Sequence, residues 1–122
     1  MKVISTPNAP AAIGPYSQGY EVNGFVYTSG QIPVDPVTGA IAEGITAQAH
    51  QSCKNVGAIL EEAGIGYENV IKTTCFLSDM ADFAAFNEVY ATYFTEKPAR
   101  SCVEVSCLPK NGLVEIEVVA AR

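Results

Sequence analysis

Residues 70–77, Val-Ile-Lys-Thr-Thr-Cys-Phe-Leu, form a largely apolar stretch that is rich in β-branched and aromatic side chains. This composition predicts a strand in the interior of a sheet. Upstream, apolar residues recur at spacings of three and four and are followed by Gly64, which predicts a helix over Thr46–Ala63 that ends at this glycine. The face of that helix expected to meet the core consists of Ile45, Ala49, Cys53, Val56, Leu60 and Ala63.

A second helix is expected after this strand. Ser78 or Asp79 can cap its first turn, and Pro98 blocks its continuation beyond about Thr95. The buried stripe of this helix is predicted to contain Met80, Phe83, Phe86 or Asn87, Tyr90 and Phe94.

The other expected strands lie towards the two ends of the chain. Residues 20–22 and 25–28 flank Asn23-Gly24, a dipeptide typical of two-residue hairpin turns because both turn positions need a positive φ. Two more strands are predicted at Ser101–Leu108 and Leu113–Ala120. Strands that alternate with helices at this length favour one α/β sheet, of the α+β kind, with both helices on one face. The other face would remain uncovered, so we expect an oligomer.

Size and charge narrow the classes of function. The 122 residues suit a single domain spanning 1–122, and hydrophobic residues at 48% suffice for a core. A net charge of -6 argues against a nucleic-acid-binding surface. No apolar run reaches the ~18 residues of a membrane span. Met1–Pro10 lacks the apolar segment of a signal peptide, so we expect a cytoplasmic protein whose four cysteines are reduced.

Metal and phosphate sites receive little support from the motifs. Gly14 and Gly19 have the spacing of a phosphate-binding loop, but no lysine follows them. His50 is the only histidine, and a pair with Cys53 is geometrically possible on one helix, although a histidine on the helix surface is the simpler interpretation. One histidine and four scattered cysteines make a poor zinc site, so we expect no metal.

Two kinds of side chain remain that could carry chemistry. Arg100, the only arginine before the terminal Arg122, starts a predicted strand, and its planar guanidinium suits a bidentate contact with a carboxylate; an exposed surface arginine is the alternative. Glu115 and Glu117 share one face of the last strand, which is either a solvated face or a place where one of them holds or moves a proton. Cys102 shares the strand face of Arg100, and we interpret it as a small residue beside a pocket rather than a nucleophile, since no base is in evidence.

Further evidence comes from stretches that occur in order along essentially the whole chain. They are residues 9–19 (APAAIGPYSQG), 28–33 (TSGQIP), 72–76 (KTTCF), 98–105 (PARSCVEV), 108–110 (LPK) and 114–117 (VEIE). Together they resemble the Rid (YjgF) family, and specifically its RidA subgroup. The segment 95–97 is shorter than in most members of that family.

This resemblance implies a chorismate-mutase-like α+β fold with a mixed sheet, assembled as a homotrimer with clefts between subunits. It also implies hydrolysis of 2-imino acids, such as 2-aminoacrylate, 2-iminopropanoate and 2-iminobutanoate, to 2-oxo acids and ammonia without a cofactor. By the same resemblance, Arg100 would bind the substrate carboxylate, Glu115 would position water, and Tyr16 would close over the site. The positions implied to line or border the pocket are Ser29, Gly30, Cys102 and Asn87.

Strand geometry adds an expectation about where the two charged side chains meet. If the last two strands paired directly as a hairpin, Arg100 and Glu115 would be roughly 20 Å apart. For Arg100 and Glu115 to act on one substrate, either another strand must lie between the last two strands or the two side chains must meet across a subunit boundary. We favour the subunit boundary.

Two other functions stay open at this stage. The same pocket could hold a 2-oxo acid as a signal in a non-catalytic binding module, which would need Arg100 but not Glu115. Ribonuclease activity, claimed for relatives, is disfavoured by the acidic balance and by the scarcity of arginine and histidine, since a nuclease must meet several phosphates.

Overall fold

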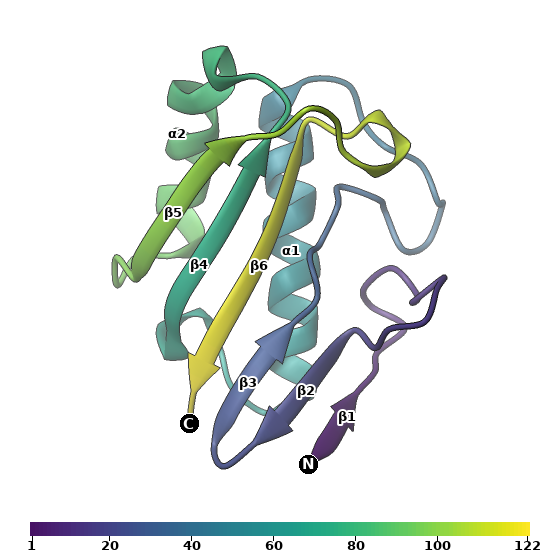
Figure 1. The fold of residues 1–122 in the computed structure, drawn as a ribbon, viewed down its shortest axis with the longest axis vertical. Helices are drawn as coiled ribbons and strands as arrows, with labels where there is room; N and C mark the ends of the chain where they lie inside the picture. The colour runs from purple at the N-terminus through teal and green to yellow at the C-terminus, as the bar shows by residue number, and fades with distance from the viewer.

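The predicted interior strand, β4 (Val70–Leu77), lies beside the C-terminal strand β6 (Val114–Ala121) inside a six-stranded sheet, in a computed structural model that describes all residues 1–122 (Figure 1). The strand order is β1-β2-β3-β6-β4-β5. Only β4 and β5 run parallel, while the other neighbours are antiparallel, so the sheet is mixed. The remaining strands are β1 (Lys2–Ile4), β2 (Gly19–Val22), β3 (Phe25–Thr28) and β5 (Ala99–Glu104).

Both helices, α1 (Ile45–Glu62) and α2 (Phe83–Tyr93), cover the same face of the sheet, as predicted (Figure 1). The core lies between them and the sheet. Strict alternation along β6 sends Val114, Ile116 and Val118 towards the helices and leaves Glu115 and Glu117 on the other face. The predicted inner face of the first helix is confirmed: Ala49, Cys53, Val56, Leu60 and Ala63 are buried, and Ile45 is partly buried.

Two turns follow the predicted backbone chemistry. Asn23 and Gly24 both have a positive φ, of 50° and 80°, and join β2 to β3 as a two-residue hairpin. Gly64 has a φ of 79° two residues after the end of α1, where its backbone N–H donates to the carbonyl of Glu61.

The stripe predicted for the second helix is wrong at Met80, which is exposed. The Asp79 side chain accepts a hydrogen bond from the backbone N–H of Ala81 at 2.9 Å, so residues Met80–Asp82 form a separate 3-10 turn before α2 begins. Burial is confirmed for Phe86, Tyr90 and Phe94, whereas Phe83 and Asn87 are only partly buried.

The strand predicted at Ser101–Leu108 is too long at its C-terminal end, because β5 stops at Glu104. The next residue, Val105, donates its backbone N–H to the carbonyl of Leu77, the last residue of β4, and beyond that point the neighbouring strand offers no further partner. The last two strands do not pair with each other, because β4 lies between them. The short β1 was not predicted. Neither helix has the length and apolar character needed to traverse a bilayer.

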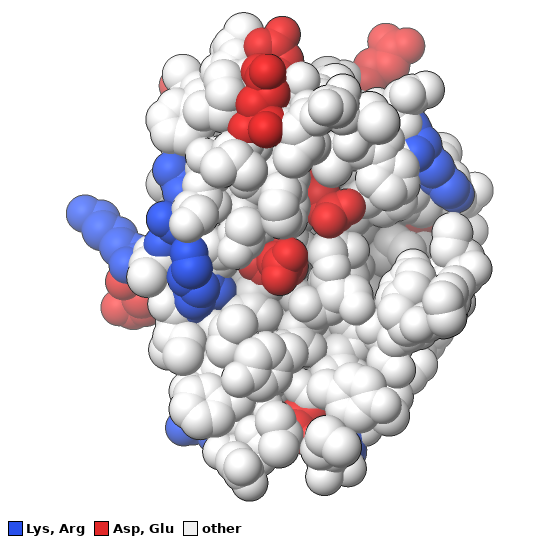
Figure 2. Space-filling view, viewed as in Figure 1, with Lys and Arg blue, Asp and Glu red and all other residues white.

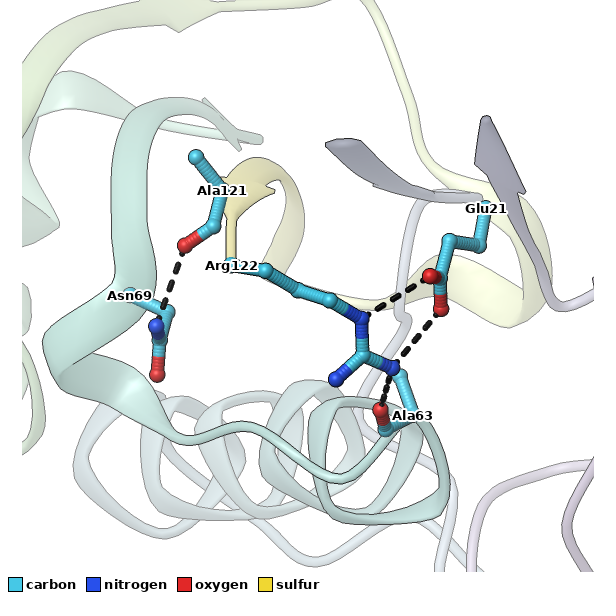
Figure 3. Close-up of polar contacts among 5 residues, drawn as sticks. All are labelled: Glu21, Ala63, Asn69, Ala121 and Arg122. Carbon is cyan, nitrogen blue, oxygen red and sulfur yellow. Dashed lines mark hydrogen bonds and ion pairs between the residues drawn. The ribbon is translucent and has the colours of Figure 1, made fainter. Parts of the chain in front are cut away.

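The C-terminal residue closes the end of the sheet against the end of α1 (Figure 3). The guanidinium of Arg122 donates two hydrogen bonds of 2.8 Å to the Glu21 carboxylate and a third to the carbonyl of Ala63. Asn69 donates to the neighbouring carbonyl of Ala121 at 3.0 Å. A cation beside the last carbonyls of a helix is favourable, so this cluster ties together β2, β6 and α1.

We expect this cluster to stabilise the fold in a pH-dependent way. The hydrogen bond from Arg122 holds the pKa of the Glu21 carboxyl below its ordinary value. A lowered pKa in the folded state means that the stabilisation is present above the unfolded pKa, about 4.3, and is lost as pH falls through the folded value. Thermal unfolding of Glu21→Gln and the parent protein should therefore differ at neutral pH and converge in acid. The exposed Glu88→Gln is the control, and a Glu21 difference that is independent of pH would contradict this account.

Candidate active site

One half of the candidate site surrounds Arg100, at the edge of the sheet. Arg100 is the register partner of Thr73 in β4, so both side chains are on the face that the helices cover. Its Nη1 donates a hydrogen bond of 2.8 Å to Oδ1 of Asn87, and its guanidinium carbon lies 4.8 Å from the ring centre of Tyr90 and 5.5 Å from that of Phe83. We call Arg100, Asn87, Tyr90 and Phe83 the arginine half-site.

The helix and a short turn create this arrangement. Phe83, Asn87 and Tyr90 are spaced four and three apart on α2, which places them on one side of the helix. The chain then reverses within the segment before Pro98, where Lys97 takes a positive φ of 54°. A hollow of about 260 Å³ remains between this turn and α2, with Arg100 in its wall.

Arg100 has no acidic partner in the chain. The one ion pair joins Arg122 to Glu21. The partners of Arg100 are a neutral amide and aromatic rings, although the chain carries a net charge of -6. A half-buried cation with neutral neighbours is suited to an anionic ligand, because the ligand would supply the missing negative charge.

The surroundings of the cysteines near this half-site favour the neutral thiol over the thiolate. Cys102 is the register partner of Cys75 and so shares the face of Arg100, but burial raises its pKa more than the nearby guanidinium lowers it. Burial also raises the pKa of the wholly buried Cys53, while Nδ1 of His50 lies 2.9 Å from the hydroxyl of Tyr93. The pair of His50 and Cys53 considered from sequence is therefore not formed, and all four cysteines are free.

The other half of the candidate site lies on the open face of the sheet around Glu115. A hollow of about 470 Å³ there is lined by Glu115, Ser29, Gly30 and Tyr16, among other residues. Figure 2 looks onto this face and shows acidic atoms near its middle, with basic atoms mostly towards the rim. We call these four residues the glutamate half-site; Glu117 borders the same hollow.

Backbone pairing sets the glutamate half-site. Gln31 and Ile116 exchange backbone hydrogen bonds of 2.8 and 3.2 Å, which brings Gly30 alongside Glu115. A Cβ at position 30 would lie 2.7 Å from the carboxyl carbon of Glu115, so a larger residue there would displace the carboxylate from this position. The buried amide of Gln18 bonds to backbone groups of residues 6–10 and thereby fixes the N-terminal segment that leads to Tyr16.

Burial raises the pKa of the Glu115 carboxyl above its ordinary value, and the charge of Glu117 raises it further. No cation contacts this carboxylate. A glutamate with a raised pKa can accept and return a proton closer to neutral pH than an exposed one, which is the property required of a general base that later acts as an acid.

The two half-sites are on opposite faces of the sheet within one chain. Arg100 is level with Thr73, and Glu115 is level with Phe76, three residues further along β4. Residues an odd number of positions apart along a strand have their side chains on opposite faces of the sheet. Arg100 and Glu115 are also separated by about 10 Å along the strands and about 10 Å across them. The intervening strand considered from sequence is therefore present, but it does not bring the two side chains to one small molecule.

A family model described as "Endoribonuclease L-PSP" matches residues 6–122. This chain belongs to that family, the Rid family. A Rid protein of Salmonella typhimurium, named 2-iminobutanoate/2-iminopropanoate deaminase, is 56% identical over 99% of this chain and 98% of its own length. The protein of that name from Escherichia coli is 52% identical, with the same coverage. The crystal structure of E. coli TdcF with bound serine has a TM-score of 0.97 and 48% identity, covering 100% of this chain and 99% of that one.

The structure groups the candidate site residues of this Rid protein into two sets. Arg100, Asn87 and Cys102 lie on one face, and Tyr16, Ser29, Gly30 and Glu115 border one hollow on the other. The sequence pattern places Tyr90 and Phe83 only in the core and does not indicate their contact with Arg100, although their helical spacing from Asn87 is compatible with it. No group of three or more histidine, cysteine, aspartate or glutamate side chains is close enough to hold a metal ion.

The raised pKa of Glu115 can be measured directly. We expect its side-chain carboxyl carbon to titrate by NMR with a midpoint above the ordinary glutamate value of about 4.3. Glu117→Gln should lower this midpoint without restoring the ordinary value, because burial is the larger cause. Glu88→Gln, on the exposed side of α2, should leave it unchanged. A parent midpoint at or below the ordinary value would refute the assignment.

Proposed function

We propose that this Rid protein hydrolyses 2-imino acids and their enamine tautomers to 2-oxo acids and ammonia, without a cofactor. The observation that carries the proposal is the guanidinium of Arg100, which is held by neutral groups and lacks an acidic partner. The names of the Salmonella and E. coli relatives support the reaction. TdcF supports the substrate class, because serine has a carboxylate and a nitrogen on the same carbon as in a 2-imino acid.

Arg100 selects a small carboxylate. One N–H of the guanidinium is engaged by Asn87, which leaves an edge of two N–H donors for a bidentate contact. Hydrogen bonds to charged groups contribute roughly 1.5–3 kcal/mol each, so this contact alone orients the substrate. Its electrophilic C=N carbon then has a fixed position relative to the protein.

Glu115 handles the proton of the attacking water. Its carboxylate accepts a proton from the water as the water oxygen forms a bond to the C=N carbon, and passes that proton to the nitrogen, which becomes an amine. Glu115 then accepts the proton of the new hydroxyl group and passes it to the amine, so that the C–N bond breaks and ammonia leaves as the C=O bond forms. One water is consumed for each 2-oxo acid and ammonia released, and the raised pKa of Glu115 suits both transfers.

The reaction requires two copies of the chain, because the arginine and glutamate half-sites lie on opposite faces of one sheet. The arginine half-site of one copy would meet the glutamate half-site of the next. Such a contact joins two different surfaces, and it generates a ring when the rotation between successive copies closes. We assign this ring to the chorismate-mutase-like homotrimer that the family resemblance implies.

The open face of the sheet supports this assembly. Val3, Tyr20 and Tyr27 are register neighbours across three strands on that face and are each more than 40% exposed. Large apolar side chains grouped on a sheet face are suited to burial against another protein surface. A second copy of this chain would both bury this face of the sheet and complete the candidate site.

Endoribonuclease activity, which the family description names, is less compatible with the surface. The chain has seven basic and thirteen acidic residues, and acidic atoms occupy the middle of the open face (Figure 2). An RNA backbone would meet like charge there, and a nuclease must neutralise several phosphates.

Two variants separate the deaminase from a binding module. Glu115→Ala should still bind 2-oxobutyrate but lose about 100-fold or more in turnover of freshly generated 2-iminobutanoate, because it lacks the proton acceptor. Arg100→Lys should weaken 2-oxobutyrate binding about tenfold or more, because a point charge cannot replace the guanidinium fork. Calorimetry and ammonia release are the measurements. Cys102→Ser is the control and should change either value little.

Unchanged turnover in Glu115→Ala would refute the deaminase mechanism and favour the binding module. Full activity in Arg100→Lys would refute the bidentate contact. Complete loss of activity in Cys102→Ser would instead indicate a nucleophilic thiol.

A further inference from the structure

We propose that Tyr90, anchored by Thr73, is a positioning residue that presets the carboxylate-binding edge of Arg100. This inference rests on the proposed function of Arg100 and adds residues to which neither the sequence nor the relatives' names assign a role. It follows from three contacts that converge on one aromatic ring.

The first contact fixes the outer end of the ring. The hydroxyl of Tyr90 lies 2.7 Å from Oγ1 of Thr73, and both side chains are buried. Thr73 is also the register partner of Arg100 across β4 and β5. The same pair of strands therefore positions the guanidinium and the hydroxyl that holds the ring beneath it.

The second and third contacts occupy the two faces of the ring. Phe94 stacks on Tyr90 with ring centres 4.5 Å apart and an interplanar angle of 29°. The guanidinium carbon of Arg100 lies 4.8 Å from the same ring centre. Since an aromatic ring has two faces and Phe94 covers one, the guanidinium takes the other, where the ring quadrupole attracts a cation.

These contacts restrict the guanidinium in complementary ways. The stack on Tyr90 limits movement of the guanidinium perpendicular to the ring, and the hydrogen bond to Asn87 limits its rotation. The unused donors then point in one direction before a ligand arrives. Ordering a long, flexible side chain during binding would weaken affinity, so a preset arginine binds a carboxylate more tightly.

The hydroxyl of Tyr90 argues against a purely space-filling role. A phenylalanine would fill almost the same volume and would need no buried partner. Here the hydroxyl is satisfied by a second buried polar group, Thr73, and the two together fix the rotation of the ring. The arrangement restricts the orientation of the surface on which Arg100 rests.

The test compares two tyrosines that each have a partly or fully buried, hydrogen-bonded hydroxyl. Tyr90→Leu removes the aromatic ring against which the Arg100 guanidinium packs. Tyr67→Leu removes a ring whose hydroxyl donates to the carbonyl of Cys53 and whose aromatic neighbours are Tyr93 and Phe94, with no contact to Arg100. Both variants should unfold at lower temperature than the parent. Calorimetry with 2-oxobutyrate, and KM and kcat for 2-iminobutanoate, are measured on the intact oligomer.

We expect Tyr90→Leu to raise the Kd for 2-oxobutyrate and the KM about tenfold, with kcat within about twofold of the parent, because only the anchor is loosened. Tyr67→Leu should leave Kd and KM unchanged. Thr73→Val, which keeps the side-chain shape, should raise Kd about threefold and remains informative if Tyr90→Leu does not fold.

Equal Kd values for Tyr90→Leu and Tyr67→Leu, or for Thr73→Val and the parent, would overturn the positioning role, as would a loss confined to kcat. The outcome is independent of the reaction. A parent protein that binds 2-oxobutyrate but releases no ammonia would refute the deaminase proposal, while the Kd comparison would still decide the role of Tyr90.

Discussion

The guanidinium of Arg100 lies half-buried at the edge of the sheet with an amide oxygen and two aromatic rings as its partners, and no carboxylate. Withdrawing a cation from water is unfavourable, and in a chain with a surplus of acidic residues a structural arginine would be expected to acquire an ion pair. Arg122 does so, through Glu21. The neutral surroundings of Arg100 are therefore the feature on which the proposed anion-binding site and the proposed substrate class depend.

The alternation of side chains along the strands determines how the two charged groups of the candidate site can meet. Arg100 and Glu115 are both well placed for their roles, yet the alternation of side chains along β4 and its neighbours sends them to opposite faces. Neither half-site alone binds the acid, activates water and returns the proton. Assembly and catalysis are therefore linked in the proposed mechanism: the exposed apolar side chains of the open face would hold the copies together, and the same contact would bring the glutamate to the arginine.

Local patterns predicted the elements well but not their order. The strand over 70–77, the helix that ends before Gly64 and the hairpin at Asn23-Gly24 depend on short-range spacing and turn chemistry, which the sequence displays directly. The insertion of β6 between β3 and β4 depends on contacts between segments far apart in the chain. Tyr90 shows the same limit within a site, because its helical spacing identified a buried face but not that Arg100 completes it. The role of Glu115 came from family resemblance, since two glutamates alternating on a strand also fit a solvated face.

The most direct measurement is the activity of mixed assemblies made from two inactive chains. Arg100→Ala and Glu115→Ala are co-expressed with different affinity tags, and assemblies that contain both are isolated by two purification steps. In a closed ring of three, every mixed assembly contains one interface with an intact arginine and an intact glutamate, so we expect about one third of the parent activity. Assemblies of either variant alone should be inactive. Mixed assemblies as inactive as the two single variants would contradict a site shared between copies.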